Sequence, residues 1–234
     1  TDVEGVYTTD PNVEINAKKI NKVSYEEMLE MSSLGAKVLQ TRSVELAMKN
    51  NLTLQVLSSL INTAGTYIVN ENELIEKEIV SGVSYSKNES KITISGIPDK
   101  PGISGKIFGL MARNNINVDM IVQNISQDGV SANMTFTVLT KDIELAKKTL
   151  ERNNNELNYT NLSTDSNIAK ISVIGMGMMS QSGVAEKMFK TLADKQINIL
   201  AISTSEIKIS VLIDKKYTDL AVKSLHSVYK LDNK

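Results

Sequence analysis

The feature that most constrains the fold of this 234-residue chain is an internal repeat. Residues 91–96 (KITISG) correspond to residues 170–175 (KISVIG), and residues 145–150 (LAKKTL) correspond to residues 220–225 (LAVKSL). Between these blocks the residues that correspond, in order, are Gly102, Lys106, Phe108, Ala112, Ile116 and Asn117 with Gly183, Lys187, Phe189, Ala193, Ile197 and Asn198. The spacing changes only between blocks, where loops are expected to absorb insertions. The chain therefore contains two copies of one structural unit.

Hydrophobic periodicity gives each copy the same order of elements. Residues 92–94 alternate like a half-buried strand, and the apolar positions that follow have helical spacing at Ile103, Ile107, Leu110 and Met111. The later segments predict strands at 116–122 and 132–139, a helix at 141–152 and a closing strand at 157–162. The order βαββαβ predicts an α+β fold of tandem ferredoxin-like units, with helices on one face of an antiparallel sheet. Exposed sheet edges favour pairing with another copy, so we expect a homo-oligomer.

The first 70 residues follow a different pattern, which predicts part of an α/β domain. Ser24 and Glu27 form a capping box that opens a helix through Leu34, and Gly35 either ends that helix or allows a close approach. A second helix is expected at 42–49 and a strand at 52–57. The polar stretch 70–77 (NENELIEK) predicts a linker. The predicted domains are residues 1–70 (partial α/β domain), 71–90 (linker and first strand), 91–165 (first repeat) and 166–234 (second repeat).

Composition excludes several function classes. The chain has no cysteine and one histidine, so thiolate sites, a cysteine nucleophile and multi-histidine metal sites are ruled out. That histidine, His226, is expected to be a solvated residue of the last helix, and the ten methionines are expected to fill cores rather than bind metal. The 26 basic and 27 acidic residues nearly balance, and the basic residues form no block in the sequence. The charge pattern therefore does not predict binding to nucleic acid or to an anionic membrane surface. No apolar run approaches the ~20 residues of a membrane span.

The most specific string is TDVEGVYTTDP at residues 1–11. By chemistry alone, its hydroxyls, carboxylates, glycine and tyrosine suit either an ordinary surface loop or a nucleotide and its phosphates. It resembles the TDVxGVYTxDP segment of the aspartate kinases, within the amino-acid kinase superfamily. Residues 24–28 (SYEEM) and 35–39 (GAKVL) resemble two further segments of that family, and the repeat resembles its paired ACT domains. The resemblance covers the whole chain in order.

The resemblance implies which residues bind ATP, with its magnesium, in the parent enzyme. They are Thr1, Asp2, Tyr7, Thr8, Thr9, Asp10, Pro11, Asn12 and Lys37. Asn12 stands where the family usually has arginine, so the resemblance does not extend to a cationic phosphate contact at this position. The family's lysine- and glycine-rich phosphate loop and its aspartate-binding residues have no match here. No catalytic residue is therefore assigned, and we expect the chain alone to be inactive.

A second group of candidates concerns an amino-acid ligand. The 97–102 turn (IPDKPG) precedes a predicted helix whose free amides suit a carboxylate, although a simple tight turn explains it equally well. Residues 179–183 of the second copy lack its aspartate and proline, so the two turns are not expected to be equivalent. The resemblance implies effector binding by both copies across an interface between ACT domains. The implied residues are Asp99, Gly102, Ser104, Asn117, Val118, Asp119, Gln123, Asn198, Ile199, Thr204 and Ser205.

These observations predict the carboxy-terminal regulatory region of a cytoplasmic aspartate kinase. The parent enzyme would phosphorylate aspartate with ATP, and this region would bind lysine, threonine or both as feedback inhibitors. The beginning at Thr1, inside a motif and without methionine, predicts a fragment of a longer protein. Two alternatives remain: a separately made, non-catalytic regulatory subunit, and an unrelated ACT protein that responds to amino acids.

Overall fold

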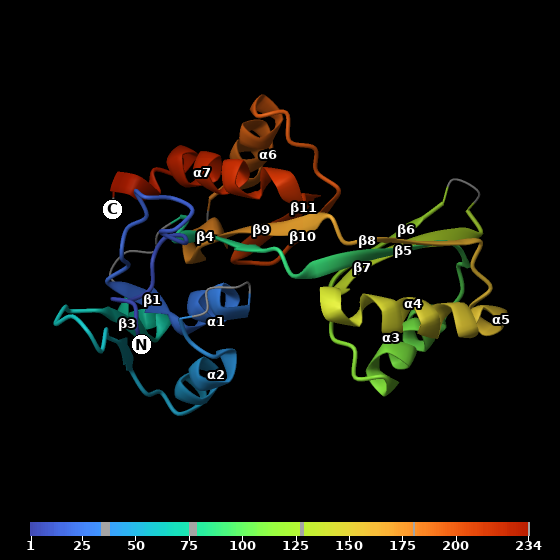
Figure 1. The fold of residues 1–234 in the computed structure, drawn as a ribbon, viewed down its shortest axis with the longest axis horizontal. Helices are drawn as coiled ribbons and strands as arrows, with labels where there is room; N and C mark the ends of the chain where they lie inside the picture. The colour runs from blue at the N-terminus through green and yellow to red at the C-terminus, as the bar shows by residue number, and fades with distance from the viewer. Residues whose placement is uncertain (34–37, 75–78, 127–128, 180, 234) are drawn as a thin grey trace. The chain divides into compact units, whose positions relative to one another are not determined.

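The computed structural model describes residues 1–33, 38–74, 79–126, 129–179 and 181–233. The chain forms two compact units, and each is described here by itself. One unit is continuous and consists of Lys87–Ala169. The other unit joins Thr1–Ser86 to Lys170–Lys234. In the sequence, the continuous unit is therefore an insertion within the other one. Figure 1 shows the elements of both units.

The inserted unit contains the first copy of the repeat. Its elements are β5 (Glu89–Pro98), α3 (Ile103–Arg113), β6 (Val118–Ile125), β7 (Ser131–Leu139), α4 (Ile143–Arg152), α5 (Asn154–Leu157) and β8 (Asn161–Asp165). The sheet order is β6-β7-β5-β8, with antiparallel pairing throughout. This is the predicted ferredoxin-like arrangement. The prediction was wrong about the closing strand, which begins at Asn161, because Leu157 ends a short helix instead.

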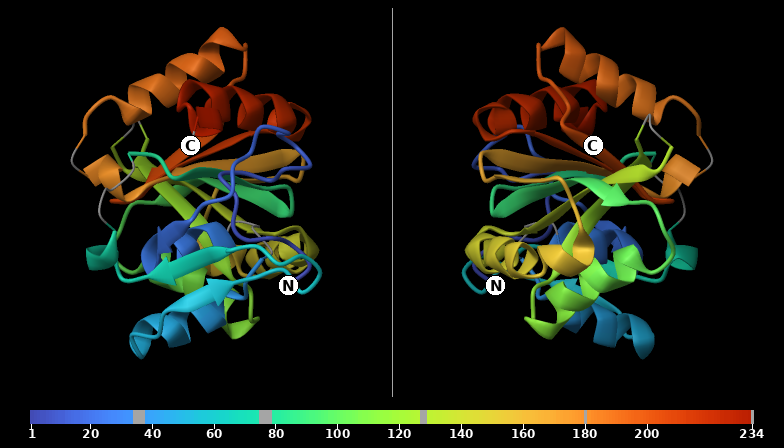
Figure 2. Two further views of the ribbon diagram at one scale, coloured as in Figure 1. Left: turned by 90° about the vertical axis from the view of Figure 1, so that its left-hand side faces the viewer. Right: turned by 90° about the vertical axis from the view of Figure 1, so that its right-hand side faces the viewer.

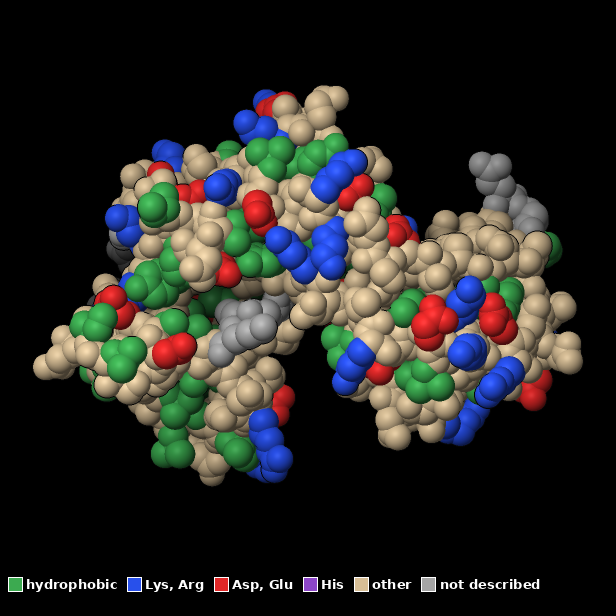
Figure 3. All heavy atoms as spheres, viewed as in Figure 1, with side chains coloured by type: hydrophobic (Ala, Val, Ile, Leu, Met, Phe, Trp, Pro, Cys, Tyr) green, Lys and Arg blue, Asp and Glu red, His purple; other side chains and the backbone are tan. Residues whose placement is uncertain are grey.

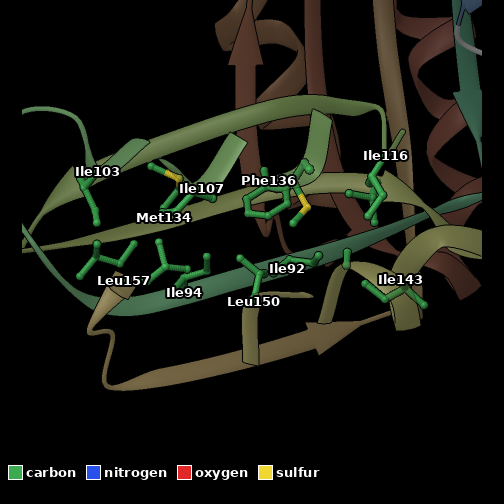
Figure 4. Close-up of a cluster of buried hydrophobic side chains, with 14 residues drawn as sticks. Ile92, Ile94, Ile103, Ile107, Ile116, Met134, Phe136, Ile143, Leu150 and Leu157 are labelled. Carbon is green, nitrogen blue, oxygen red and sulfur yellow. The ribbon is translucent and has the colours of Figure 1, made fainter. Parts of the chain in front are cut away.

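The core of the inserted unit lies between its sheet and helices. Ser90, Ile92 and Ile94 of β5 are buried with half-buried residues between them, as expected for a strand with one face toward a core. The helices contribute apolar side chains at spacings of three and four, and Phe108 meets Phe136 edge to face at 5.4 Å. Figure 4 shows these side chains gathered into one cluster.

The other unit begins with a small mixed sheet and two helices. They are β1 (Lys22–Ser24), α1 (Tyr25–Ser33), α2 (Thr41–Lys49), β2 (Leu54–Val56) and β3 (Thr66–Val69). The order is β1-β3-β2, with β1 parallel and β2 antiparallel to β3. The capping box is confirmed, because the Glu27 amide donates to Ser24 Oγ and the Ser24 amide donates to Glu27 Oε2. The predicted helix end at Leu34 and Gly35 lies outside the described residues.

The second copy of the repeat completes this unit, but it does not close its own sheet as predicted. Its elements are β9 (Ile168–Ile174), α6 (Val184–Asp194), β10 (Ala201–Thr204), β11 (Lys208–Asp214) and α7 (Thr218–Val228). The sheet order is β10-β11-β9-β4, where β4 is Gly82–Ser86. The fourth strand therefore comes from before the first copy. It takes this place by pairing antiparallel with β9, from Gly82 opposite Ile174 to Ser86 opposite Lys170.

Both faces of this second sheet are covered. All seven residues of β9 are buried, in contrast to the alternating pattern of β5. Helices α6 and α7 cover one face, and α1 lies against the other (Figure 2). Ile174 shares a core cluster with Met28 and Met31 of α1, and Lys208 of β11 forms an ion pair of 2.7 Å with Glu30. The first part of the chain and the second repeat are thus packed as one body.

Candidate functional site

The 1–12 segment is held in place largely by its own backbone. The Thr8 amide donates to the Lys18 carbonyl and the Ile20 amide donates to the Val6 carbonyl, each at 2.8 Å. At the far end, the Asp10 carbonyl accepts from the amides of Val13 and Glu14. The Asp10 carboxylate also accepts from the Asn12 amide at 2.9 Å, which is an Asx turn. The turn-rich string is therefore an ordered loop with defined ends.

Helix α7 of the second repeat reaches this segment through His226. His226 Nε2 lies 2.8 Å from the Thr8 hydroxyl oxygen, and both residues are only 1% exposed. The expectation that His226 is solvated was wrong. Its spacing from Val222 and Leu225 places it on the buried face of α7, and that spacing is the sequence signal that could have shown this.

Strand β4 holds the same segment from a second direction. The Val83 amide donates to the Thr8 carbonyl at 2.7 Å, and the Tyr85 hydroxyl donates to Asp10 Oδ2 at 3.0 Å. Burial, together with the Asp10 carboxylate, raises the pKa of Tyr85 to about 12. A Cβ on Gly82 would lie 2.8 Å from the Thr8 carbonyl oxygen, so this close approach requires glycine.

The remaining ATP candidates differ in exposure. Tyr7 is half-buried, and burial followed by the nearby Glu4 raises its pKa. The Thr9 hydroxyl is buried with no hydrogen-bond partner among the described residues, which marks it as a group that a ligand could satisfy. Lys37 lies outside the described residues. The exposed candidates are Thr1, Asp2, Pro11 and Asn12.

Helix α1 is joined to the second repeat by Glu27, whose role there the sequence did not indicate. Glu27 is 2% exposed, and its Oε2 serves the capping box. Its Oε1 accepts from the Ser81 hydroxyl at 2.5 Å and from the Met176 amide at 3.0 Å. Met176 begins the connection from β9 to α6, which corresponds to the 97–102 turn of the first copy. One carboxylate therefore links α1 to that connection.

The effector candidates of the first copy lie along α3, β6 and the turn before α3. Ser104 donates to Gln123 Oε1 at 3.0 Å, while Asp119 is exposed on β6. Asn117 and Val118 line an open groove of about 600 Å³. The other residues that line it are Phe108, Met111, Ala112, Asn115, Ile116 and Ile121. Apart from Asn115 and Asn117, its lining is apolar.

The turns before α3 and α6 have the same backbone at their last residue. Gly102 and Gly183 both have a φ of 91°, with ψ of −9° and −5°. A Cβ would meet nothing within 4 Å at either glycine, so both helix starts are open. Asp99 precedes the first helix start, and its amide is bonded to the Val130 carbonyl at 3.0 Å.

The effector candidates of the second copy lie at β10, in the other unit. Thr204 ends β10, and the Ser205 amide donates to the Lys208 carbonyl at 2.8 Å. Asn198 and Ile199 lie just before β10, with Asn198 exposed and Ile199 half-buried. Both β6 and β10 are edge strands.

Charged side chains and hydropathy add three observations. Acidic and basic side chains are interspersed over α3 and α4 on the face seen in Figure 3. Within the described residues, no three histidine, cysteine, aspartate or glutamate side chains come together as a metal site. None of the described helices has the length and apolar character needed to cross a membrane.

Family comparisons agree with this architecture. The ACT domain family matches residues 92–153 and 171–229, which are the two copies of the repeat. The amino acid kinase family matches residues 1–58. This combination defines a protein that joins part of an amino acid kinase domain to a pair of ACT domains.

Individual relatives narrow the class. Aspartate kinase of Pseudomonas putida is 49% identical over 233 residues, which cover 99% of this chain and 56% of that protein. Escherichia coli aspartokinase III, crystallised with aspartate and ADP, has a TM-score of 0.84 and 26% identity over 97% of this chain and 51% of that one. A structure of aspartokinase alpha and beta subunits is 42% identical, with a TM-score of 0.61 over 64% of this chain and 99% of that one. The chain belongs to the aspartate kinase family, and it spans just over half the length of its Pseudomonas relative.

Proposed function

We propose that this chain is the carboxy-terminal region of an aspartate kinase that is regulated by an amino acid. The complete enzyme would transfer the γ-phosphoryl group of ATP to the β-carboxylate of aspartate in the cytoplasm. The observation that carries the proposal is the packing of the amino acid kinase segment and the second ACT repeat as one unit. An effector bound by an ACT repeat would then act on a body that includes part of the kinase domain.

We assign the 1–12 segment to nucleotide binding. The loop is ordered by its own hydrogen bonds, and the orphaned Thr9 hydroxyl fits a site that a ligand completes. Asn12 is exposed next to Asp10 and would bind the nucleotide as a neutral group. In phosphoryl transfer the protein mainly positions groups and neutralises charge, and magnesium would arrive bound to the nucleotide phosphates. The crystal structure of the E. coli relative contains ADP, which supports a nucleotide substrate.

We assign regulation to the ACT repeats. A second structure of E. coli aspartokinase III, at 27% identity and a TM-score of 0.77, contains lysine and aspartate. Lysine or threonine is therefore our proposed effector here. Asp119 and Gln123 in one repeat, and Thr204 and Ser205 in the other, offer acceptors and hydroxyls for an amino acid. A coupling of ~1–3 kcal/mol between effector and substrate sites would suffice for feedback inhibition.

The edge strands of the repeats support a homo-oligomer. Both β6 and β10 lie at the edges of their sheets, and Ile121, Ile125 and Ile202 are exposed on them. Such edges are normally covered by pairing. A second copy of the chain is the proposed partner.

The alternative is a separately made regulatory subunit. The match to 99% of an aspartokinase subunit chain favours it. That match leaves about a third of this chain unaccounted for, and residues 1–58 match the amino acid kinase family instead. We therefore favour a region of the kinase polypeptide.

The experiment compares two proteins: the complete kinase and the isolated 234-residue chain. Aspartyl phosphate formation is expected from the complete kinase only, and calorimetric titration of the chain with lysine, threonine and methionine is expected to show which one binds. Binding of none of them would overturn the regulatory assignment. Phosphorylation of aspartate by the isolated chain would show that the catalytic groups were assigned to the wrong part of the enzyme.

A further inference from the structure

The contact between His226 and Thr8 joins the end of the second ACT repeat to the middle of the proposed nucleotide segment. The two residues are 218 positions apart, and their side chains meet at 2.8 Å in a buried environment. No other histidine exists in the chain. Local turn formation cannot produce a hydrogen bond between such distant parts of the sequence, so this bond depends on the packing of α7 against the 1–12 segment.

The chemistry of the Thr8 hydroxyl shows what the contact does. The oxygen accepts from the Lys18 amide at 3.0 Å, which leaves one proton and one lone pair. Either imidazole tautomer can therefore bond it through Nε2. The Thr8 amide and carbonyl are also bonded, to the Lys18 carbonyl and the Val83 amide. With His226 in place, every polar group of Thr8 has a partner.

The neighbours of Thr8 are the groups that would face the nucleotide. Thr9 follows directly with its orphaned hydroxyl, and Asp10 forms the turn that presents Asn12. Because Thr8 is fixed through both its backbone and its side chain, the direction of the chain at Thr9 and Asp10 is fixed as well. A buried hydrogen bond is costly to lose, so His226 restrains this loop in its present form.

We propose that His226 is a positioning residue for the nucleotide: it acts through Thr8, without touching ATP, to hold the 7–12 loop in its binding conformation. The inference rests on the proposed nucleotide site. It makes α7 of the second ACT repeat a structural part of that site. A shift of α7 would then alter nucleotide affinity directly.

Two substitutions at His226 distinguish the effect of the hydrogen bond to Thr8 from the effect of any polar side chain at this position. In His226→Gln the terminal amide can occupy the place of Nε2, whereas in His226→Asn it is too short to reach Thr8. In the complete kinase we expect His226→Asn to raise the KM for ATP about fivefold with kcat within about twofold, because binding rather than chemistry is disturbed. His226→Gln is expected to stay within about twofold of the wild type in both constants.

Two further variants complete the test. In a Thr8→Val background the difference between the asparagine and glutamine variants is expected to vanish, because the shared partner is gone. Tyr229→Phe is the matched control, since Tyr229 directly follows α7 and its hydroxyl donates to the carbonyl of Val184, the first residue of α6, at 2.7 Å. Its KM for ATP should not change.

The outcomes distinguish this inference from the function on which it rests. If the wild-type kinase neither turns over nor binds ADP in a calorimeter, the nucleotide site is wrong and the inference goes with it. If the wild type binds ADP and the asparagine and glutamine variants have the same KM for ATP, only the inference is overturned. If Tyr229→Phe raises the KM for ATP as much as His226→Asn does, the inference is also overturned, because His226 would then act only by stabilising α7.

Discussion

At the scale of single residues, the buried carboxylate of Glu27 shows how one side chain serves two parts of the fold. It accepts hydrogen bonds from the Ser24 amide and hydroxyl, the Ser81 hydroxyl and the Met176 amide. These donors come from the last residue of β1, the residue before β4 and the second residue after β9. Because a carboxylate has two oxygens and about four acceptor sites, this set of donors satisfies it without a cation.

We expect Glu27→Gln to destabilise the chain by about 2–3 kcal/mol, although the two side chains have the same shape. The amide has only one oxygen, so donors that face its nitrogen lose their acceptor inside the protein. Urea unfolding followed by circular dichroism measures the change. Glu144→Gln is the control, because Glu144 is also in the first turn of a helix but is exposed, and its effect should stay within ~0.5 kcal/mol. Equal effects at the two positions would show that the donors around Glu27 find other partners.

Tyr85 gives a prediction about alkaline pH. Its pKa is raised from 10.0 to about 12, first by burial and then by Asp10. The neutral phenol is the form that the folded state favours, so its contribution is fully present below pH 10 and is lost as the pH rises through 12. Tyr85→Phe should therefore be less stable than the wild type at neutral pH and should lose less stability between pH 10 and 12.

Tyrosinate absorbance checks the prediction independently, because the chain has seven tyrosines and no tryptophan. The difference between wild-type and Tyr85→Phe titrations should show one group with a midpoint well above 10. A midpoint near 10 would mean that Tyr85 is solvated rather than bonded to Asp10.

The sequence predicted the capping-box bonds of Glu27, but neither its bonds to Ser81 and Met176 nor the bond between Tyr85 and Asp10. A capping box is a local pattern, and it was readable because Ser24 and Glu27 are three residues apart. The bonds to Ser81 and Met176 depend on chain segments that only the complete fold brings together. The same limit applies to His226, whose partner Thr8 lies near the other end of the chain.

At the scale of elements, strand β4 is what the repeat pattern did not reveal. The two copies match in sequence from their first strands to their last helices, and this predicted the order of β5 to α4 and of β9 to α7. The fourth strands of the two sheets do not correspond. The sheet of the first copy is completed by β8, at the end of that copy, whereas the sheet of the second copy is completed by β4, which precedes the first copy in the sequence. The repeat pattern could not show this pairing, because the whole first copy separates β4 from β9 in the sequence.

Two glycine substitutions test how closely β4 approaches the 1–12 segment. In Gly82→Ala the new Cβ would lie 2.8 Å from the Thr8 carbonyl oxygen, so β4 must move and the bond from Val83 to Thr8 must stretch. We expect destabilisation of about 1–3 kcal/mol. In Gly105→Ala, within α3, the Cβ meets nothing within 4 Å, so the variant should be about 0.5–1 kcal/mol more stable. Chemical unfolding measures the free energy of unfolding of both variants, which should fall for Gly82→Ala and rise for Gly105→Ala. A stabilised Gly82→Ala would contradict the packing of β4 on Thr8.

At the scale of the whole molecule, the two ACT repeats have different surroundings. The second sheet is enclosed between its own helices and α1, whereas β5 of the first alternates between buried and half-buried positions. The second repeat is therefore built into the body that contains the kinase segment, and the first is a separate insertion. The candidate effector residues are divided between them. The sequence named these candidates through the family resemblance, and they stay predictions because an effector site depends on how chains assemble, which the pattern of one chain does not show.

Variants in both repeats test whether both sets of candidates serve the effector. Asp119 on β6 offers a carboxylate for an ammonium group, and Ser205 follows the edge strand β10 with a hydroxyl. Loss of one hydrogen bond to a charged ligand costs ~1.5–3 kcal/mol, which corresponds to about ten- to a hundredfold in affinity. We therefore expect Asp119→Ala or Ser205→Ala, in the complete kinase, to raise the inhibitory concentration of lysine or threonine at least tenfold, measured against each variant's own uninhibited rate. Gln181→Ala is the control, because Gln181 is exposed in the connection before α6 and carries no effector assignment. Relief of inhibition by Gln181→Ala, with inhibition intact in the other two variants, would move the effector to the open start of α6, where Gly183 has the same backbone as Gly102.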